Sequence, residues 1–508
     1  MSMQTSGQWL LSRGLFLSLF FFNVNLAVCI YGDEPNSKRP NIVILYADDM
    51  GYGDLAIQNP ESKIPTPNLD RLAKEGIRFT DAHSSSGVCT PSRYALLQGR
   101  YHWRKFHSIV NSFDQPVLDP ERTTLAELLK GQGYRTACVG KWHLGWDWNS
   151  IKKPGAKADP QAGFSPTDFE WTKPVPGGPR DHGFDYYFGD DVPNFPPYTW
   201  FENDRLLAAP TVSFATKTQT AEGSFEARKG PAVKDWDFYA VVPRLTEKAV
   251  AWIAEQKKGE PFFFYFPFTS PHAPIVPADI YRDKSHAGGY GDFVFQTDDA
   301  VGRVLDALEK GGFSENTIVI FSSDNGPETY AYERVRKFEH RSMGPLRGLK
   351  RDLWEGGHRV PFVIRWPSTI PAGKVNDSLI SQMDLYASIA TITGATIPEG
   401  SAEDSIDQLQ LFTSTGPGRR DSLVHNTNAN GYAIRHGDWV LISAKTGAVS
   451  KVPEWFDKLN GYPADSQPGQ LFNLREDLGQ KRNLFAENPA KVAELTERLK
   501  AIQTGSSR

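Results

Sequence analysis

Two pairs of oxygen-bearing side chains directly follow apolar runs of the chain. Asp48 and Asp49 come after residues 41–47, and Asp324 with Asn325 ends a second apolar run. If both runs are parallel strands, these side chains meet at the carboxyl edge of the sheet, where open α/β folds bind ligands. Three carboxylates and an amide, without an imidazole, suit Ca²⁺ and, less well, Mg²⁺. We predict a metal site here, although a helix cap or a turn is the commoner explanation for either pair alone.

Basic side chains follow other apolar runs in the same way. Lys141 and His143 come after residues 134–139, His272 lies in a Ser-Pro-His-Ala-Pro segment after another run, and Lys350 follows Gly-Leu. Taken singly, each is typical of a solvated surface or a rigid turn. Their shared position at predicted strand ends, with charge opposite to that of the acids, favours a common functional site.

A cysteine motif adds a reactive group to this set. Cys89-Thr90-Pro91-Ser92-Arg93 is accompanied by four other short motifs: Gly140-Lys141-Trp142-His143, Ser270-Pro271-His272, Asp324-Asn325-Gly326 and Gly348-Leu349-Lys350. Together they resemble the arylsulfatase-like, formylglycine-dependent sulfatases of the alkaline phosphatase superfamily, over roughly residues 40–484. In that family a maturation enzyme oxidises the cysteine to an aldehyde, formylglycine.

The resemblance implies a role for each matching residue. It implies that Ca²⁺ is bound by five side chains, namely Asp48, Asp49, Asp324, Asn325 and the modified Cys89. Arg93 would position and polarise the aldehyde hydrate, while Lys141 and Lys350 would hold the sulfate. His143 would take the proton that lets the hemiacetal collapse. His272 would contact the substrate and protonate the leaving alcohol.

This set of groups suits the cleavage of a sulfate ester. The reaction builds charge on the nonbridging oxygens, which a divalent cation and lysines stabilise. It also builds charge on the leaving oxygen, which a histidine can protonate. A serine or a thiol does not let the sulfated intermediate collapse easily, whereas a geminal diol expels sulfate by regenerating the aldehyde. Asn325 matters because related phosphatases often carry histidine there and use softer metals.

The residues that would select a substrate are less clearly marked in the sequence than the catalytic motifs. Residues 181–185 are similar to a family segment that shapes the entrance to the site. We predict that four side chains at the mouth of the site contact the substrate: His182, Asp191, Asn194 and His340. Asp190, Tyr198 and Trp200 are further candidates for sugar contacts, although packing is the commoner role of such aromatic side chains.

The elements that position these residues alternate between strands and helices. Near-continuous apolar runs predict buried strands over residues 41–47, 134–139, 262–266 and 317–321. Capping signals at Thr66 and Thr124 and helical spacing over residues 245–253 and 294–308 predict helices between them. We therefore expect an α/β fold in which a large, mostly parallel sheet lies between helices, as in alkaline phosphatase.

The pattern changes after about residue 405. Short strands over residues 422–425, 431–435 and 439–443 and an amphipathic helix over residues 489–502 predict a smaller antiparallel sheet with one helix. We therefore divide the chain into a catalytic sulfatase domain, residues 38–404, and a C-terminal α+β subdomain, residues 405–508. Residues 151–237 are predicted to form loops and short strands at the mouth of the site.

The N-terminus bears on the cellular location of the protein, and the overall charge bears on the partners it can bind. Residues 1–32 are predicted to be a signal peptide, because the apolar stretch after Arg13 is too short for a stable transmembrane segment. We expect an exported protein, periplasmic or secreted, in which Cys29 is either removed or lipidated. The net charge of −4 excludes a general nucleic-acid binder, since no basic excess neutralises phosphates.

Of the three cysteines, Cys89 and Cys138 would remain after cleavage. One disulfide between them is an alternative in an exported protein. Cys138 lies in a predicted buried strand, where a small apolar packing role is the more common one.

Three hypotheses for function follow. The first is hydrolysis of an O-sulfate, on a sugar or polysaccharide or in another sulfate ester, with Ca²⁺ and formylglycine. The second is a phosphomonoesterase or phosphodiesterase of the same fold, which would need no aldehyde and would prefer transition metals. The third is a noncatalytic protein that binds sulfated glycans.

Overall fold

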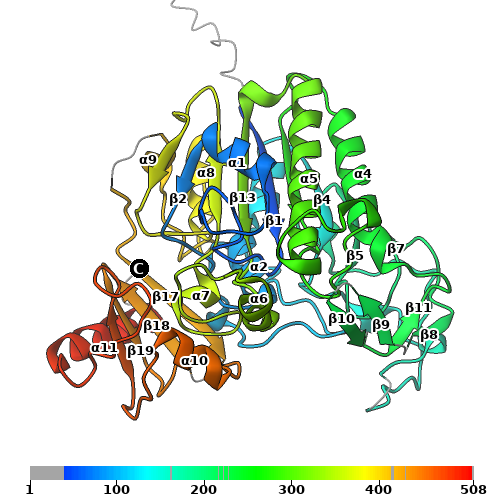
Figure 1. Ribbon diagram of the computed structural model, residues 1–508. Helices are drawn as coiled ribbons and strands as arrows, with labels where there is room; N and C mark the ends of the chain where they lie inside the picture. Colours follow the sequence, from blue (N-terminus) through cyan, green and yellow to red (C-terminus); the bar gives the residue numbers. More distant parts are fainter. Residues whose placement is uncertain are drawn as a thin grey trace, which may run out of the picture. The chain divides into compact units, whose positions relative to one another are not determined.

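The computed structural model describes residues 39–160, 163–214, 217–220, 222–226, 228–413, 417–428 and 431–505 (Figure 1). The predicted signal peptide, residues 1–32, and Cys29 lie outside this part of the chain. No helix within the described ranges combines the length and the apolar character that crossing a bilayer requires.

A large sheet forms the centre of the fold. Its ten strands lie in the order β15-β2-β14-β13-β1-β12-β4-β5-β6-β7. Five central neighbours are parallel: β13 (Thr317–Ser323), β1 (Asn41–Ala47), β12 (Phe262–Pro267), β4 (Arg135–Lys141) and β5 (Tyr186–Asp191). The outer strands are β14 (Phe362–Arg365), β2 (Ile77–Phe79), β15 (Lys374–Asn376), β6 (Phe201–Glu202) and β7 (Arg205–Leu206). The carboxyl ends of the five central strands therefore share one edge.

Helices cover both faces of this sheet. The β1 side chains Ile42, Ile44 and Tyr46 share a core with α2 (Cys89–Gln98), α3 (Leu125–Gly131) and α8 (Asp384–Thr393). The alternate side chains Val43, Leu45 and Ala47 share the opposite core with α1 (Pro67–Lys74), α4 (Val241–Ala254) and α5 (Gly288–Lys310) (Figure 1). A strand covered on both faces is apolar at every position, which explains the continuous runs in the sequence. The predicted α/β fold class is confirmed.

The two predicted helix starts differ in detail. Thr124 forms a complete capping box: its hydroxyl accepts a bond from Glu127 N at 3.1 Å, and the Glu127 carboxylate accepts one from Thr124 N at 2.7 Å. Thr66 does precede α1, but its hydroxyl donates to the Asp70 carboxylate at 3.0 Å and accepts from Ala56 N at 3.0 Å, so it caps no N–H of the helix.

Burial explains why two of the helices that were not predicted, α2 and α8, escaped detection. All ten residues of α2 are buried, and α8 is buried at eight positions. Helices are recognised in a sequence by one apolar and one polar face. A helix that is enclosed on all sides has no such pattern.

A separate four-stranded antiparallel sheet lies near the C-terminus. Its strands are β17 (Ser422–Asn428), β18 (Gly431–His436), β19 (Trp439–Ile442) and β20 (Gln470–Asn473). Helix α11 (Pro489–Gln503) packs Leu495, Leu499 and Ile502 into the core of this sheet. The smaller antiparallel sheet with a helix is thus confirmed, while the division of domains at residue 405 stays a prediction.

Short strands and turns make up much of residues 151–237, as predicted. Strand β8 (Val212–Phe214) pairs with β11 (Gly230–Ala232), and β9 (Lys217–Thr220) pairs with β10 (Gly223–Glu226). Strand β5 of the same segment joins the large sheet beside β4.

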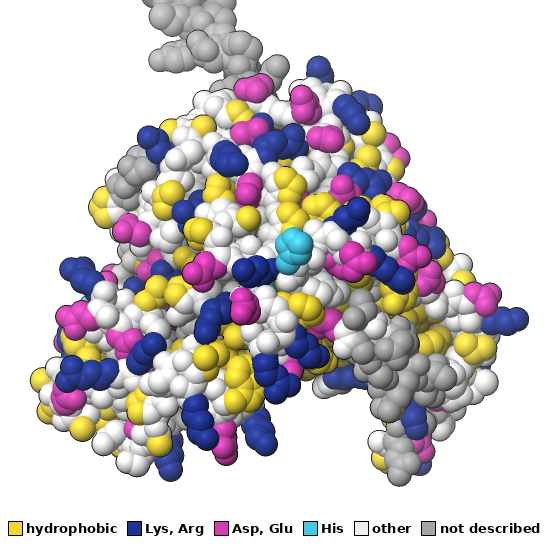
Figure 2. All heavy atoms as spheres, in the orientation of Figure 1, with side chains coloured by type: hydrophobic (Ala, Val, Ile, Leu, Met, Phe, Trp, Pro, Cys, Tyr) yellow, Lys and Arg dark blue, Asp and Glu magenta, His cyan; other side chains and the backbone are white. Residues whose placement is uncertain are grey.

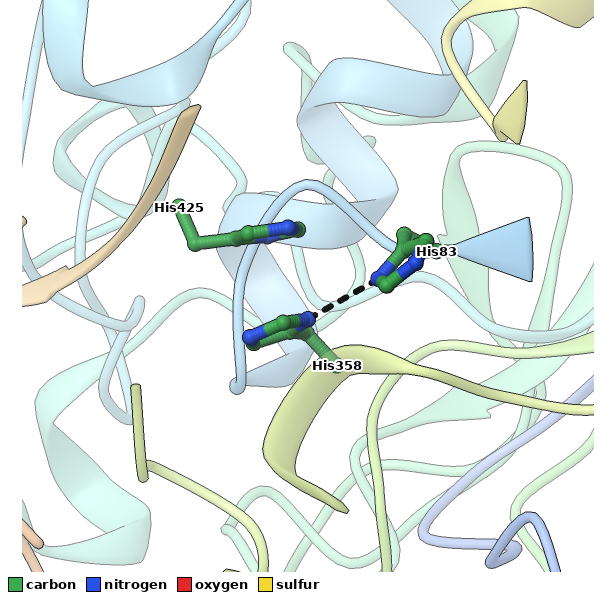
Figure 3. A group of neighbouring side chains, drawn as sticks. All are labelled: His83, His358 and His425. Atoms are coloured by element: carbon green, nitrogen blue, oxygen red, sulfur yellow. Dashed lines mark hydrogen bonds between the residues drawn. The ribbon is translucent and has the colours of Figure 1, made fainter. Parts of the chain in front are cut away.

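Three buried histidines, His83, His358 and His425, pack against one another (Figure 3). They come from β3 (Ala82–His83), α7 (Glu355–His358) and β17. His83 Nδ1 lies 3.0 Å from His358 Nδ1, and the rings of His358 and His425 stack with centroids 3.5 Å apart at 12°. The nearly parallel rings of His358 and His425 hold their nitrogen lone pairs in separate planes, and one ring nitrogen from each of the three histidines lies within 4.8 Å of the others. The cluster therefore joins β17 to β3 and α7 through polar and stacking contacts.

The capping box gives a stability prediction. Thr124→Ala should lower the free energy of unfolding by about 1–2 kcal/mol, because it leaves a helix N–H without its acceptor. Chemical denaturation measures this change. Thr123→Ala removes the same atoms one residue earlier and is the control. Equal losses in the two variants would mean that the cap contributes nothing.

Candidate active site

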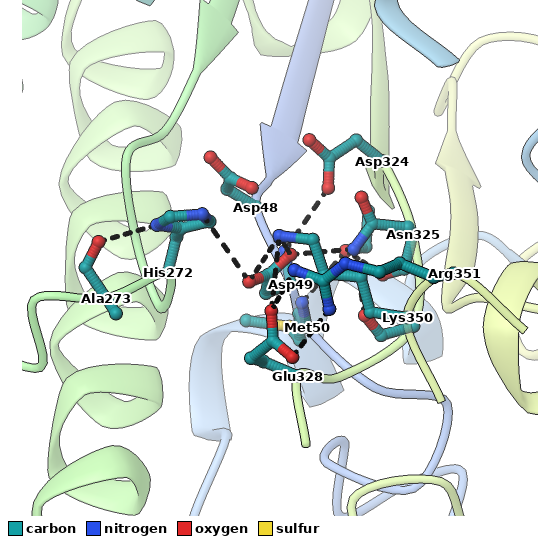
Figure 4. Close-up of polar contacts among 12 residues, drawn as sticks. Asp48, Asp49, Met50, His272, Ala273, Asp324, Asn325, Glu328, Lys350 and Arg351 are labelled. Carbon is teal, nitrogen blue, oxygen red and sulfur yellow. Dashed lines mark hydrogen bonds and ion pairs between the residues drawn. The ribbon is translucent and has the colours of Figure 1, made fainter. Parts of the chain in front are cut away.

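The two acidic pairs meet at the carboxyl edge of the large sheet (Figure 4). Asp48 and Asp49 follow β1, and Asp324 and Asn325 follow β13. Asp49 N donates to Asp324 Oδ1 at 3.2 Å, and Asn325 Nδ2 donates to Asp49 Oδ1 at 2.7 Å. These side chains come together because β1 and β13 are parallel neighbours in register, Ala47 beside Ser323.

Three basic side chains pair with these acids. Lys141 Nζ bonds to an Asp48 oxygen, and Lys350 Nζ lies 2.7 Å from Asp49 Oδ1. Burial alone would raise the pKa of Asp48, but Lys141, His272 and Arg93 hold it well below its usual range. Burial likewise opposes the charge of Lys350, yet Asp49 raises the pKa of that lysine above its ordinary value.

Arg93 ties the acids to the cysteine helix. Its Nη2 and Nε donate to Asp324 Oδ2 at 2.8 and 3.2 Å, and its Nη1 donates to Lys141 O at 3.0 Å. One helical turn earlier, Cys89 begins α2 and is buried. Because Cys89 and Arg93 are four residues apart on α2, they share one face of the helix, and the bond from Arg93 to Asp324 brings this face to the acids.

Both cysteines in the described part of the chain, Cys89 and Cys138, have free thiols. Cys138 is fully buried in β4 within the core, and burial raises its pKa well above the ordinary thiol value. Such a thiol is inert, which agrees with the predicted packing role.

The hydrogen bonds of His143 leave one ring nitrogen as an acceptor. Its Nε2 lies 2.9 Å from Val110 O, and because a carbonyl only accepts, Nε2 carries the proton. Nδ1 is buried without a hydrogen-bond partner among the described residues. Burial lowers the pKa of this histidine well below its usual value. The ring is therefore a neutral base.

His272 presents its other nitrogen to the acids. Nδ1 donates to Ala273 O at 2.6 Å, and Nε2 lies 3.8 Å from Asp49 Oδ2 (Figure 4). One ligand atom from each of Asp48, Asp49 and His272 lies within 4.8 Å of the others. Burial lowers the pKa of His272 to about 4. An anion bound nearby would raise that pKa, because an opposite charge favours the protonated form.

Comparison with known proteins decides between the hypotheses. A family model described as Sulfatase matches residues 40–395 of this chain. The chain belongs to the sulfatase family. It is a sulfuric ester hydrolase, so the sulfatase hypothesis is confirmed over the phosphoesterase and the noncatalytic one.

Individual relatives also support membership of the sulfatase family. The N-acetylgalactosamine-6-O-sulfatase of Bacteroides thetaiotaomicron is 31% identical over 509 residues, covering 92% of this chain and 94% of that protein. Arylsulfatase A of Homo sapiens is 31% identical over 484 residues, covering 92% and 87%. A solved structure, titled for the metabolism of multiple glycosaminoglycans by Bacteroides thetaiotaomicron, matches with a TM-score of 0.78 and 30% identity, covering 92% of this chain and 100% of that one.

A glycine lets the sulfatase bring Lys141 to the acids. Gly140 has φ 131°, and a Cβ there would lie 2.0 Å from Pro267 O on β12. The pairing of β4 with β5 shifts register at this point, between Val139 and Lys141. Only glycine adopts this backbone conformation without strain.

The residues predicted to contact substrate fall into two groups. Asp191 Oδ1 accepts a bond from His143 N at 3.1 Å, and the Asn194 side-chain carbonyl is buried without a partner among the described residues. His182 and His340, in contrast, belong to the scaffold. The His182 ring stacks on Trp142, with ring centroids 6.1 Å apart. Both ring nitrogens of His340 form hydrogen bonds. Nε2 bonds to Asp54 Oδ1 at 2.8 Å, and Nδ1 accepts from Lys63 N at 3.3 Å.

The predicted aromatic candidates pack inside the mouth. Tyr198 is 1% exposed, and its hydroxyl donates to Asn194 O at 3.0 Å. Trp200 stacks on Phe188 with ring centroids 5.1 Å apart. Their positions are those of packing residues.

Sequence reasoning missed an ion pair beside Lys350. Arg351 donates to both oxygens of Glu328 at 2.7 Å, and Glu328 lies 3.9 Å from Lys350 Nζ (Figure 4). Arg351 has φ 80°, a rare conformation for a residue other than glycine. The position of Arg351 directly after Lys350 in the sequence was the one indication that it lies near the site.

Asp190 gives a pH prediction. This carboxyl is 2% exposed, neither oxygen bonds to another described residue, and burial raises its pKa to about 7. The folded protein therefore binds an extra proton between about pH 4 and pH 7, so this group lowers stability progressively as pH rises through that window.

Asp190→Asn removes the ionisable group. It should make the protein about 2–4 kcal/mol more stable than wild type at pH 8, with a much smaller difference at pH 4. Denaturant titrations at the two pH values measure this, with exposed Asp235→Asn as the control. A difference that does not change with pH would contradict the assignment.

Proposed function

We propose that this sulfatase hydrolyses an O-sulfate on a sugar or polysaccharide, with Ca²⁺ and a formylglycine made from Cys89. The observation that carries the proposal is the convergence of Asp48, Asp49, Asp324 and Asn325 with Cys89 and buried cations at one sheet edge. The relative named as an N-acetylgalactosamine-6-O-sulfatase supports a sugar sulfate as substrate.

Two buried oxygens support a bound cation. Asp48 Oδ1 and Asn325 Oδ1 are buried and have no hydrogen-bond partner within the described part of the chain. A buried polar oxygen without a partner is costly, and a hard cation would satisfy both. Asp48, Asp49, Asp324 and Asn325, with residue 89, would hold Ca²⁺, which suits all-oxygen ligands. When bound, the ion would withdraw charge from the sulfate oxygens.

The place of Cys89 supports its conversion to formylglycine. It lies at the start of α2, beside Arg93 and Lys350 and near the acids. When formed, the aldehyde hydrate would supply the nucleophilic hydroxyl. Conversion requires the formylglycine-generating maturation enzyme as a partner.

The basic side chains would bind the sulfate. Lys141 and Lys350 contact Asp48 and Asp49, so their ammonium groups border the place where an anion would meet the cation. Fixed positive charge there stabilises the charge that develops on the nonbridging oxygens. Arg93, held by Asp324, would orient residue 89.

The two histidines would divide the proton transfers between them. His143 would accept a proton from residue 89. Its Nδ1 has no hydrogen-bond partner among the described residues, and burial lowers its pKa. His272 would give a proton from Nε2 to the leaving alcohol, since its Nδ1 proton is committed to Ala273 O. Asp191 and Asn194 would contact the sugar.

We also propose that the protein is exported. The predicted signal peptide, residues 1–32, supports this, and Cys29 at its end leaves a lipid anchor as the alternative.

Mass spectrometry tests the modification. After coexpression with the maturation enzyme, the peptide that contains Cys89 should carry an aldehyde, while Cys138 in the same digest should still alkylate as a thiol. Cys89→Ser should lose turnover by about 10³-fold or more yet retain substrate binding. An intact Cys89 thiol with undiminished sulfatase activity would falsify the assignment.

Metal removal tests the ion. EDTA should abolish hydrolysis and lower the thermal unfolding midpoint, and Ca²⁺ should restore both, because an ion that binds only the folded state stabilises it. Ca²⁺ at about 100 times its Kd should add roughly 2.7 kcal/mol. Recovery with Zn²⁺ alone would instead favour a softer metal and count against the proposal.

A further inference from the structure

Most of the cations at the active site are already neutralised by an acidic side chain. Lys141 pairs with Asp48, and Lys350 pairs with Asp49. Arg93 and Arg351 likewise pair with Asp324 and Glu328. On the face shown in Figure 2, basic and acidic side chains also lie interspersed. A cation near the site without an acidic partner is therefore informative.

Arg228 is such a cation. It precedes β11, and its carbonyl accepts a bond from the Tyr198 hydroxyl at 2.8 Å, which fixes the backbone. Its guanidinium lies 3.5 Å from the centre of the Phe195 ring. Phe195 in turn packs edge-on against His143, with ring centroids 5.5 Å apart at 81°. This stack extends from the mouth to the proposed base.

The guanidinium is held in place but not neutralised. Its side-chain hydrogen bond is from Nη1 to Asn111 Oδ1, a neutral acceptor at 3.4 Å, and no described carboxylate forms an ion pair with it. Burial lowers the pKa of Arg228, while Tyr198 and Cys89 oppose that effect. An arginine stays charged and has five N–H donors in a planar fork that fits carboxylate or sulfate. Stacking on Phe195 orients that fork before substrate arrives.

We propose that Arg228 binds a second anionic group of the substrate, so that this sulfatase prefers a saccharide with a carboxylate or another sulfate beside the ester it hydrolyses. The inference rests on the proposed function and extends it from sulfated sugars in general to those with two neighbouring anions. Lys141 and Lys350 would take the reacting sulfate, and Arg228 would take the group that stays on the product.

The test compares kcat/KM within two substrate pairs, using the matured, Ca²⁺-loaded enzyme. In the first pair the same sulfated sugar is joined to a uronic acid or to a neutral hexose. In the second pair a monosaccharide carries one sulfate or two. Wild type should prefer the doubly anionic member of at least one pair, and the pair concerned identifies the second anion.

Arg228→Gln should reduce that preference by about 10- to 100-fold, the value of one charge-assisted contact. Arg228→Lys should recover part of it, because charge returns without the planar fork. Lys229→Gln removes a charge from the adjacent residue and should leave the preference unchanged. The proposal is overturned if wild type hydrolyses the saccharides without a preference in either pair, or if Arg228→Gln retains the preference.

A binding measurement separates this proposal from the proposed function. In a Cys89→Ser background, calorimetry should show weaker binding of the preferred saccharide when Arg228 is also replaced by Gln. If wild type hydrolyses none of the four saccharides but binding still depends on Arg228, the anion site stands and the proposed function fails. If hydrolysis occurs and binding does not depend on Arg228, only the present inference fails.

Discussion

Opposite charges buried together at the end of the central strands are the constraint on which this structure depends. Asp48, Asp49 and Asp324 are at most 1% exposed. Removing an unpaired carboxylate from water costs several kcal/mol, and removing one member of a buried pair costs about 3–5 kcal/mol. Lys141 is buried with Asp48 and holds its pKa well below the usual range, whereas burial and the neighbouring Asp48 raise the pKa of Asp324 well above its usual value despite the pairing with Arg93. The cluster therefore forms as a unit.

The parallel sheet is what makes that unit possible. Each central strand ends at the same edge, so a polar residue placed directly after an apolar run reaches the cluster. Two of these residues sit in the left-handed region, Asp49 with φ 65° and His143 with φ 56°. Such conformations are costly outside glycine and gather at functional sites. Here Asp49 is held by the Tyr290 hydroxyl, which donates to its carbonyl at 3.0 Å.

The smaller sheet supports the segment that leads into the cysteine helix. Ser86 Oγ donates to Asn426 O on β17 at 2.8 Å, and Arg351 N donates to Gly87 O at 2.7 Å. With the stacked histidines, these bonds fix residues 83–88 against β17, α7 and Arg351. The position of residue 89 thus depends on contacts with β17 as well as on the catalytic core.

The sequence by itself determined four of the five central strands, all but β5, together with the capped helix after Thr124 and the acids and cations that follow those strands. These features are local: an apolar run shows a strand covered on both faces, and the next residues lie at its end. The tertiary structure alone decided the rest. His340 lies against Asp54, 286 residues away, and Arg228 lies over Phe195 across an irregular segment. Helix α2 is buried on all sides and so lost its periodic pattern. Burial and pairing depend on which distant segments pack together, and no local run of residues encodes that.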